Sequence, residues 1–147
     1  GLTFRMADAY NQVSYLGRGD HETYIDRNQS GRIGLYDTTV ERMFHYYATP
    51  QSTANRTDVR WAKLTDQAGE GVFMESNRFQ FSIIPFSDVL LEKAHHINEL
   101  ERDGMITIHL DAEQAGVGTA TCGPGVLPQY LVPVKKQSFE FTLYPVK

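Results

Sequence analysis

The sequence predicts an all-β protein with one α-helix, built as an antiparallel β-sandwich. Apolar residues alternate with polar ones in the segments 79–83, 106–110 and 139–143, and this period of two is typical of strands with one buried face. Only residues 87–101 have the apolar spacing of a helix. The chain has 147 residues, the size of a single domain, and we see no internal repeat or linker in it.

The remaining strands have weaker patterns. In the clearest strand Phe79, Phe81 and Ile83 alternate with Gln80 and Ser82, which predicts that the two polar side chains face away from the core. Glycine, asparagine, aspartate and proline separate this strand from its neighbours. Five further strands are predicted over residues 2–7, 11–17, 58–66, 71–76 and 128–134.

The single helix is predicted near residues 87–101. Ser87 is suited to the N-cap position, and Gly104 lies just beyond the expected end. One apolar stripe runs along this segment, formed by Val89 or Leu90, then Ala94, Ile97 and Leu100.

Composition excludes several classes of function. Eighteen acidic and fourteen basic residues give a net charge of −4 without a basic cluster, which argues against nucleic acid as a partner. No apolar run approaches the roughly 20 residues of a membrane span, so we expect no membrane partner. The one cysteine, Cys122, cannot form an intrachain disulfide. The sequence leaves the compartment open, with the bacterial cytoplasm or periplasm as first candidates.

No local cluster has the pattern of a metal or nucleotide site. His95 and His96 are adjacent, so on a helix they point about 100° apart and cannot easily share one ion. The neighbours of Cys122 carry no charge that would activate a thiol nucleophile. The stretch "GVGT" lacks the lysine of a phosphate-binding loop. We expect neither a metal nor a cofactor in this chain.

Two pairs of acids could be considered for glycoside hydrolysis, which needs two carboxylates roughly 5–9 Å apart. They are Glu22 with Asp26, and Asp111 with Glu113. Asp26 is followed by an arginine in a turn, and Asp111 follows a strand where aspartate commonly forms a turn with its own backbone. We therefore favour structural roles and expect no catalytic residue here.

Four blocks of this sequence resemble one known family. "VSYLGRGDHETYIDR", "YYATPQSTANRTDVRW", "FQFSIIPFS" and "AGVGTATCGPGVLPQY" occur in this order. They are similar to motifs of the C-terminal, small-chain domain (domain 5) of glycoside hydrolase family 2 β-galactosidases. The similarity runs from about Leu2 to the end of the chain.

The resemblance implies a fold and an activity. This chain would be the second half of a supersandwich similar to the galactose mutarotases, and the partner of the remaining β-galactosidase chain. The catalytic (β/α)8 barrel with both catalytic glutamates would lie upstream, so the isolated chain would be inactive. The whole enzyme would hydrolyse terminal β-galactosides such as lactose with retention of configuration, and any Mg²⁺ and Na⁺ would bind elsewhere in it.

The resemblance also marks a structural signature and explains an Arg-Gly-Asp triplet. Asp20 stands where the family usually has proline, so the triplet is read as accidental rather than as an adhesion signal. Ser52 and Ala54 replace a usual glutamate and glycine, which puts in doubt any contact made by that glutamate. The signature residues are Gly17, Arg18, Gly19, Glu22, Tyr24, Asp26, Arg27, Asn55, Arg56, Asp58, Arg60 and Trp61.

One loop is expected at the rim of the sugar cleft. In the family this loop carries a tryptophan that forms an apolar platform beside the galactoside, and either Cys122 or Gly123 takes its place here. The substrate-rim residues predicted from the resemblance are Gly118, Thr119, Ala120, Thr121, Cys122, Gly123 and Pro124.

Three functions are compared. The first is a non-catalytic segment of a β-galactosidase, and the second is a free-standing carbohydrate-binding module. The third is a mutarotase-like enzyme, whose acid and base could come only from His21 with Glu22, or from His109 with Asp111. We favour the first, and we expect a fragment of a larger sandwich to associate with itself through exposed sheet edges.

Overall fold

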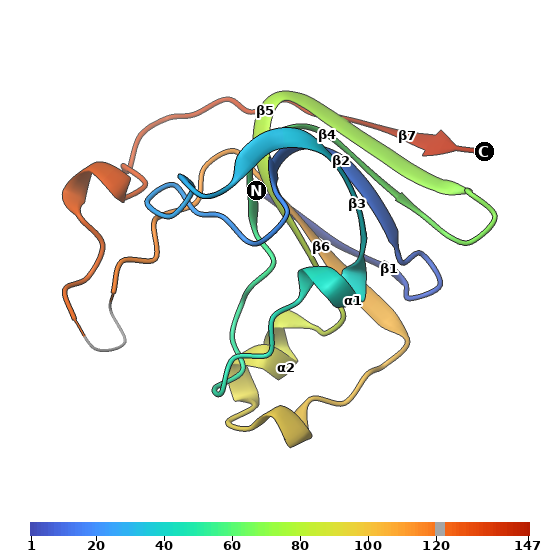
Figure 1. Ribbon diagram of the computed structural model, residues 1–147, viewed down its shortest axis with the longest axis horizontal. Helices are drawn as coiled ribbons and strands as arrows, with labels where there is room; N and C mark the ends of the chain where they lie inside the picture. Colours follow the sequence, from blue (N-terminus) through green and yellow to red (C-terminus); the bar gives the residue numbers. More distant parts are fainter. Residues whose placement is uncertain (120–122) are drawn as a thin grey trace.

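The computed structural model describes residues 1–119 and 123–147. Seven antiparallel strands in this part of the chain form one sheet, six of them in the order β1-β6-β5-β4-β2-β3 and β7 paired with β5 off this path (Figure 1). The long strand β5 pairs with β4 on one edge, while its other edge takes β7 at its start and β6 at its end. The strands are β1 (Leu2–Ala7), β2 (Gln12–Gly19), β3 (Arg32–Thr39), β4 (Arg56–Thr65), β5 (Gly71–Ile84), β6 (Met105–Asp111) and β7 (Thr142–Val146).

The helical elements are short. α1 (Val40–Met43) follows β3, and α2 (Asp88–Lys93) follows β5. Two 3₁₀ turns cover Ile97–Glu99 and Pro128–Tyr130. None of the helices in the described ranges is long and apolar enough to cross a membrane.

The core lies on the concave face of this curved sheet (Figure 1). Val13 and Tyr15 of β2 pack there opposite Ala62 and Leu64 of β4, and all four side chains are buried. The ring of Tyr15 contacts that of Phe81 edge to face, with their centroids 5.3 Å apart. The prediction of an all-β protein is confirmed, and one curved sheet is consistent with a layer of a sandwich.

The opposite, convex face carries an aromatic stripe. The ring of Trp61 stacks on Phe73 at 5.3 Å between centroids, and Phe73 stacks on Tyr144 at 5.0 Å. Leu16 of β2 continues the stripe, because it pairs with Trp61 on one side and with Leu35 on the other. This outer stripe therefore crosses five strands, and its end at Leu35 is 72% exposed.

Several predicted elements have different bounds. The strands expected over 71–76 and 79–83 are one continuous strand, β5. The strand expected over 139–143 begins only at Thr142. The prediction of a strand over 128–134 was wrong: Pro128 begins a 3₁₀ turn, and with Pro133 it removes two backbone donors that a sheet ladder needs.

The helix predicted over 87–101 is correct only for its first part. Ser87 caps α2 by accepting a hydrogen bond from the Leu90 N–H at 3.2 Å, as its sequence indicated. The helix ends at Lys93, since the C-cap residue Ala94 is extended. Beyond it the His95 N–H donates to the Glu99 carboxylate at 2.8 Å instead of to a helical carbonyl. A side chain that competes in this way for a backbone donor favours a turn over a longer helix.

Two further differences concern burial. Gln80 and Ser82 were expected to face away from the core in a half-buried strand, but both are buried. Strand β5 lies in the middle of the sheet, and at this end it is covered on both faces. Strand β3 was not predicted at all, because its apolar residues Ile33 and Leu35 are exposed on the convex face and Gly34 interrupts the pattern.

Candidate functional site

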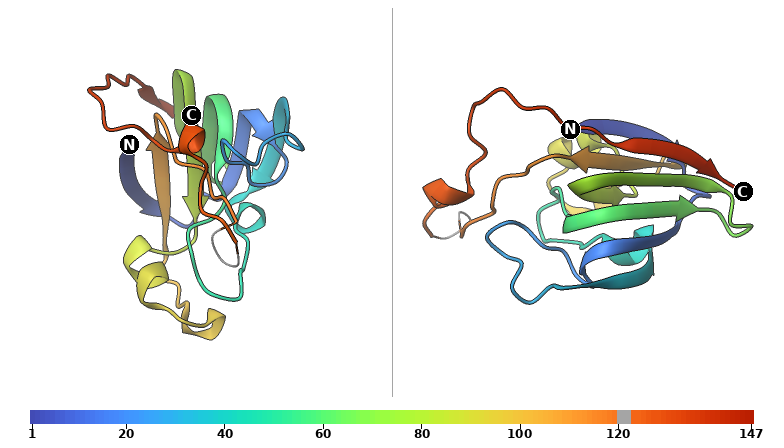
Figure 2. Two further views of the ribbon diagram at one scale, coloured as in Figure 1. Left: turned by 90° about the vertical axis from the view of Figure 1, so that its left-hand side faces the viewer. Right: turned by 90° about the horizontal axis from the view of Figure 1, so that it is seen from above.

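Loops from distant parts of the sequence gather at one end of the sheet (Figure 2). They are the corner formed by residues 20–31 after β2, the segment 44–55 before β4, and residues 112–119 and 123–132 after β6. The "GRGDHETYIDR" stretch supplies the corner. Backbone pairing holds it to the second loop, because the Thr23 N–H donates to the Asn55 carbonyl at 2.8 Å.

The carboxylate of Glu22 fixes the corner. It is buried and accepts hydrogen bonds from the hydroxyls of Thr53 and Tyr47, from the Ala54 N–H at 3.3 Å, and from Arg27 at 3.1 Å. Burial would raise the pKa of Glu22, but these donors together lower it below its usual value. Glu22 is therefore a charged, fully engaged structural carboxylate.

A second buried carboxylate, Asp58, lies between two guanidinium groups. Arg18 and Arg78 both form ion pairs with it. The Asp58 backbone has a φ of 55°, in the left-handed region that aspartate tolerates better than most residues. Arg18 is thus engaged inside the protein, whereas the side chain of Asp20 is exposed, so the Arg-Gly-Asp triplet is not displayed as a unit.

Arg56 is 1% exposed and makes its contacts with neutral groups. It donates to the Tyr15 hydroxyl at 3.0 Å and to the carbonyls of Ala54 at 3.0 Å, Asn55 at 3.3 Å and Asp20 at 2.9 Å. Its five N–H groups suit this role because they can join several carbonyls at once. Arg56 therefore connects β2, the corner and the start of β4.

Asp26 joins the corner to the predicted rim loop. Its carboxylate accepts the N–H groups of Val117 at 3.0 Å and Gly118 at 2.7 Å. A Cβ atom on Gly116 would lie only 2.5 Å from this carboxylate, so glycine is needed for the close approach. The bond from the Gly116 N–H to the Tyr130 carbonyl, 2.9 Å long, holds the other side of the segment.

The neck of the loop is closed on itself. The backbone N–H of Thr119 donates to the Pro124 carbonyl at 3.1 Å, and the Thr119 hydroxyl donates to the same oxygen at 2.9 Å. Gly118 and Thr119 therefore lie on one side of the neck, with Gly123 and Pro124 on the other. The predicted rim residues Ala120, Thr121 and Cys122 fall outside the described residues.

A family model described as "Beta galactosidase small chain" matches residues 1–143. The chain belongs to this β-galactosidase small-chain family. It is 35% identical to a β-galactosidase of Vibrio cholerae over 144 residues and to one of Kluyveromyces lactis over 146 residues. Each match covers 97% of this chain, and the chain spans 14% of the length of these relatives. The family expected from the sequence motifs is confirmed.

Most signature residues of the small-chain segment meet at the corner, but two do not. Trp61 lies in the outer stripe of β4, and Arg60 beside it is exposed. Tyr24 is buried within the corner, and burial raises the pKa of its hydroxyl. Gly17 and Gly19 are tightly packed, since an added Cβ atom would lie 2.8 Å from Val59 or 2.1 Å from the Tyr15 hydroxyl.

In each acid–base pair considered for a mutarotase, the histidine binds other residues rather than its expected carboxylate. His21 contacts Ser30 at 2.9 Å and Asp20 at 3.3 Å rather than Glu22. His109 lies between Asp88 and Thr3, with both contacts at 3.1 Å, rather than against Asp111. Within residues 1–119 and 123–147, no group of three histidine, cysteine or acidic residues is arranged to hold a metal ion.

Three residues in or against the corner were not selected from the sequence: Thr23, Tyr47 and Thr53. The Thr23 hydroxyl contacts that of Thr57 at 2.9 Å and accepts the Thr57 N–H at 3.0 Å. Tyr47 has a raised pKa because of burial and its hydrogen bond to Glu22. Their only sequence signal was membership of the same motif blocks, because hydroxyl residues have many equivalent uses in loops.

A cleft of about 540 Å³ lies between the corner and the neck of the rim loop. Arg27 and Tyr47 form one side, Gln51 and Ser52 another, and the backbone at Gly118 a third. The cleft offers a guanidinium, a phenol and an amide, whereas the carboxylate of Glu22 is already engaged. This arrangement suits binding of a polar neutral group rather than acid–base chemistry.

We expect Gly116→Ala to loosen the rim loop, because the new methyl group displaces the Asp26 carboxylate. Overpacking of this kind costs about 1–3 kcal/mol of unfolding free energy. Urea unfolding should show the loss, and hydrogen exchange should accelerate at Val117 and Gly118. Gly125→Ala is the matched control, since nothing lies within 4 Å of its added Cβ. Equal effects from both variants would contradict the role of Asp26.

We expect Glu22 to contribute to the pH dependence of stability. Because its folded-state pKa lies below the usual 4.5, its contribution is complete above about pH 4.5 and is lost as the pH falls through the folded-state value. Glu22→Gln should therefore destabilise the protein at pH 7 by about 1–3 kcal/mol. Urea unfolding curves should show that the difference in unfolding free energy between this variant and the wild type narrows as the pH is lowered. Glu140→Gln, at an exposed position, is the control, and a gap independent of pH would contradict this assignment.

Proposed function

We propose that this chain is a non-catalytic, C-terminal segment of a retaining β-galactosidase that hydrolyses terminal β-D-galactosides such as lactose. Its relatives are β-galactosidases about seven times its length, given that it spans 14% of them. Retaining hydrolysis needs two carboxylates about 5–5.5 Å apart across the scissile bond. The two buried acids at this end of the sheet, Glu22 in the corner and Asp58 on β4, are saturated by their partners, and we place the catalytic glutamates upstream in the barrel.

The observation that carries this proposal is the link between Asp26 and the loop at 116–124. Two N–H groups of the loop bind one carboxylate of the corner, so the position of the loop is set by the rigid end of the sheet. Residues 116–125 carry no charged side chain, which suits the rim of a cleft for a neutral sugar. We assign this segment the task of holding the rim loop beside the galactoside.

The outer stripe is proposed as the surface that meets the rest of the β-galactosidase chain. The stacked rings of Trp61, Phe73 and Tyr144 cover one another's faces, so they present edges rather than a flat platform for a sugar. An apolar face of this kind is typical of a protein interface. Leu35 lies on β3, which is an edge strand of the sheet.

The central test uses the full-length enzyme that carries this segment. Asp26→Ala should release the rim loop and lower kcat/KM for lactose by roughly tenfold or more, because small displacements of positioning groups have large kinetic effects. Asp8→Ala is the control, since Asp8 is exposed in the turn that follows β1, away from the corner. An unchanged kcat/KM for the Asp26 variant would reject the rim assignment.

The isolated chain should not hydrolyse a chromogenic β-galactoside, because the acids at the corner are engaged and the catalytic pair is placed elsewhere. A continuous absorbance assay of the purified chain gives the answer. Turnover above the buffer blank that disappears in an acid-to-amide variant of this chain would refute the proposal.

The isolated chain should self-associate through its exposed stripe and edge. Leu35→Lys places a charge on the β3 edge, and such charges block pairing between strands of different chains. We expect this variant to lower the average mass measured by light scattering at high concentration. Val134→Lys, in the exposed segment after Tyr130, should not. A wild-type chain that stays monomeric throughout would contradict this.

A further inference from the structure

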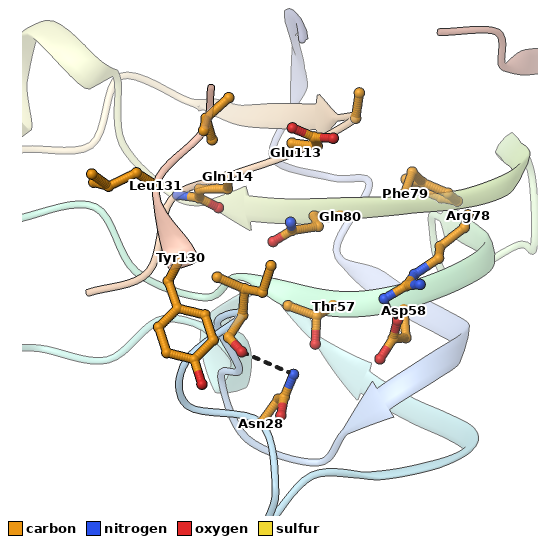
Figure 3. A pocket seen from close by; sticks show the side chains of 13 residues that line it. Asn28, Thr57, Asp58, Arg78, Phe79, Gln80, Glu113, Gln114, Tyr130 and Leu131 are labelled. Carbon is orange, nitrogen blue, oxygen red and sulfur yellow. Dashed lines mark hydrogen bonds and ion pairs between the residues drawn. The ribbon is translucent and has the colours of Figure 1, made fainter. Parts of the chain in front are cut away.

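A second cavity lies beside the corner and shares no lining residue with the first cleft. It has a volume of about 320 Å³ and lies where the start of β4 and the middle of β5 meet the segments 112–114 and 130–132 (Figure 3). Ile25 and Asn28 of the corner line it, whereas Glu22 and Arg27 line the first cleft. We call it the Gln80 pocket, after the residue in its floor.

The side-chain amide of Gln80 is held in one orientation. Asn55 is 2% exposed, and its NH₂ group donates to the Thr23 carbonyl at 2.8 Å and to the Gln80 Oε1 at 2.9 Å. Because the Asn55 N–H donates to one terminal atom of the Gln80 amide, that atom is the oxygen and the other terminal atom is the nitrogen. The described part of the chain supplies no acceptor for this nitrogen. Gln80 therefore offers a fixed, unused donor to the pocket.

Each charged side chain that lines the Gln80 pocket already has a partner of opposite charge. Figure 3 shows Asp58 and Arg78 pointing toward each other, and they form an ion pair. Glu113 is bound by Lys135 at 3.3 Å and by Gln137 at 3.0 Å. A ligand with a net charge would compete with these pairs and gain little, which argues against a phosphate or a carboxylate.

The walls combine an aromatic ring with amides. Tyr130 is half-buried and lies across the pocket from Arg78, with Asn28 and Gln80 between them (Figure 3). The backbone that carries the Tyr130 ring is fixed on both sides. The Tyr130 N–H donates to the Leu127 carbonyl at 2.9 Å, and the Tyr130 carbonyl accepts from the Gly116 N–H. Gln114 adds another amide. Small-molecule pockets typically combine apolar walls with a few fixed polar groups in this way.

We propose that the Gln80 pocket binds a neutral saccharide of one or two rings. Such a ligand has an apolar C–H face that packs on an aromatic ring, and hydroxyls that both donate to and accept from amides. The volume is at the low end of the roughly 300–1,000 Å³ common for ligand sites, which limits the number of rings. The site is distinct from the rim loop, and this inference does not rest on the proposed function.

The test is a titration of the ¹⁵N-labelled 147-residue chain with D-galactose and with lactose, followed by NMR. The side-chain NH₂ signals of Gln80 and Gln114 should shift together and saturate. Tyr130→Ala should weaken binding at least tenfold, whereas Tyr130→Phe should retain it. Tyr144→Ala, which removes an exposed tyrosine from the outer stripe, is the matched control and should bind as wild type does.

Other outcomes overturn the proposal. Shifts confined to Val117 and Gly118 would place the sugar at the rim loop instead, and tighter binding of D-galacturonate than of D-galactose would refute a neutral ligand. Crystals of the full-length enzyme soaked in galactose give an independent answer. Sugar density against Tyr130 supports the site, and another segment of the chain filling the pocket overturns it.

Discussion

The buried carboxylate of Glu22 organises the end of the sheet where both cavities lie. Transfer of a charge into a protein interior costs several kcal/mol unless hydrogen bonds replace its water. Four donors from two chain segments meet this need, so the corner and residues 47–54 are fixed relative to each other. Displacement of residues 47–54 would leave the Glu22 carboxylate with Arg27 as its remaining donor among these four.

Two further polar groups extend this order outward from the corner. Asp26 binds backbone donors of the rim loop, and Asn55 sets the orientation of Gln80. In both cases the hydrogen bonds of one side chain fix the direction of another group. The first cleft and the Gln80 pocket thus share a single rigid element, the corner. Different residues of the corner line each of the two cavities.

The two faces of the sheet differ for a physical reason. The concave face is closed over a core whose central side chains, such as Phe81 and Ile108, are fully buried. The convex face keeps the outer stripe, whose rings are only partly covered by one another. The chain spans 14% of its relatives, whose remaining length is available to cover this face, in line with our proposal for the stripe.

The parts of the fold that could be predicted are those that the local sequence pattern encodes. Alternation located the strands around Phe79 and Ile106, because burial on one side of a strand repeats every second residue. It missed β3, where the apolar side chains face outward, and it did not anticipate the burial of Gln80. The predicted helix was too long because the backbone becomes extended at Ala94 and the next N–H, of His95, binds the Glu99 side chain; apolar periodicity does not register such contacts.

By itself, the sequence determined the all-β class, the family and the signature corner, since these depend on residue types and on their order. Only the tertiary structure decided which partners those residues take. Asp26 meets Val117 across 91 positions of sequence, and Asn55 meets Gln80 across 25. A carboxylate or an amide can accept many partners of equal chemistry, so the choice is made by the packing of the sheet that brings the segments together.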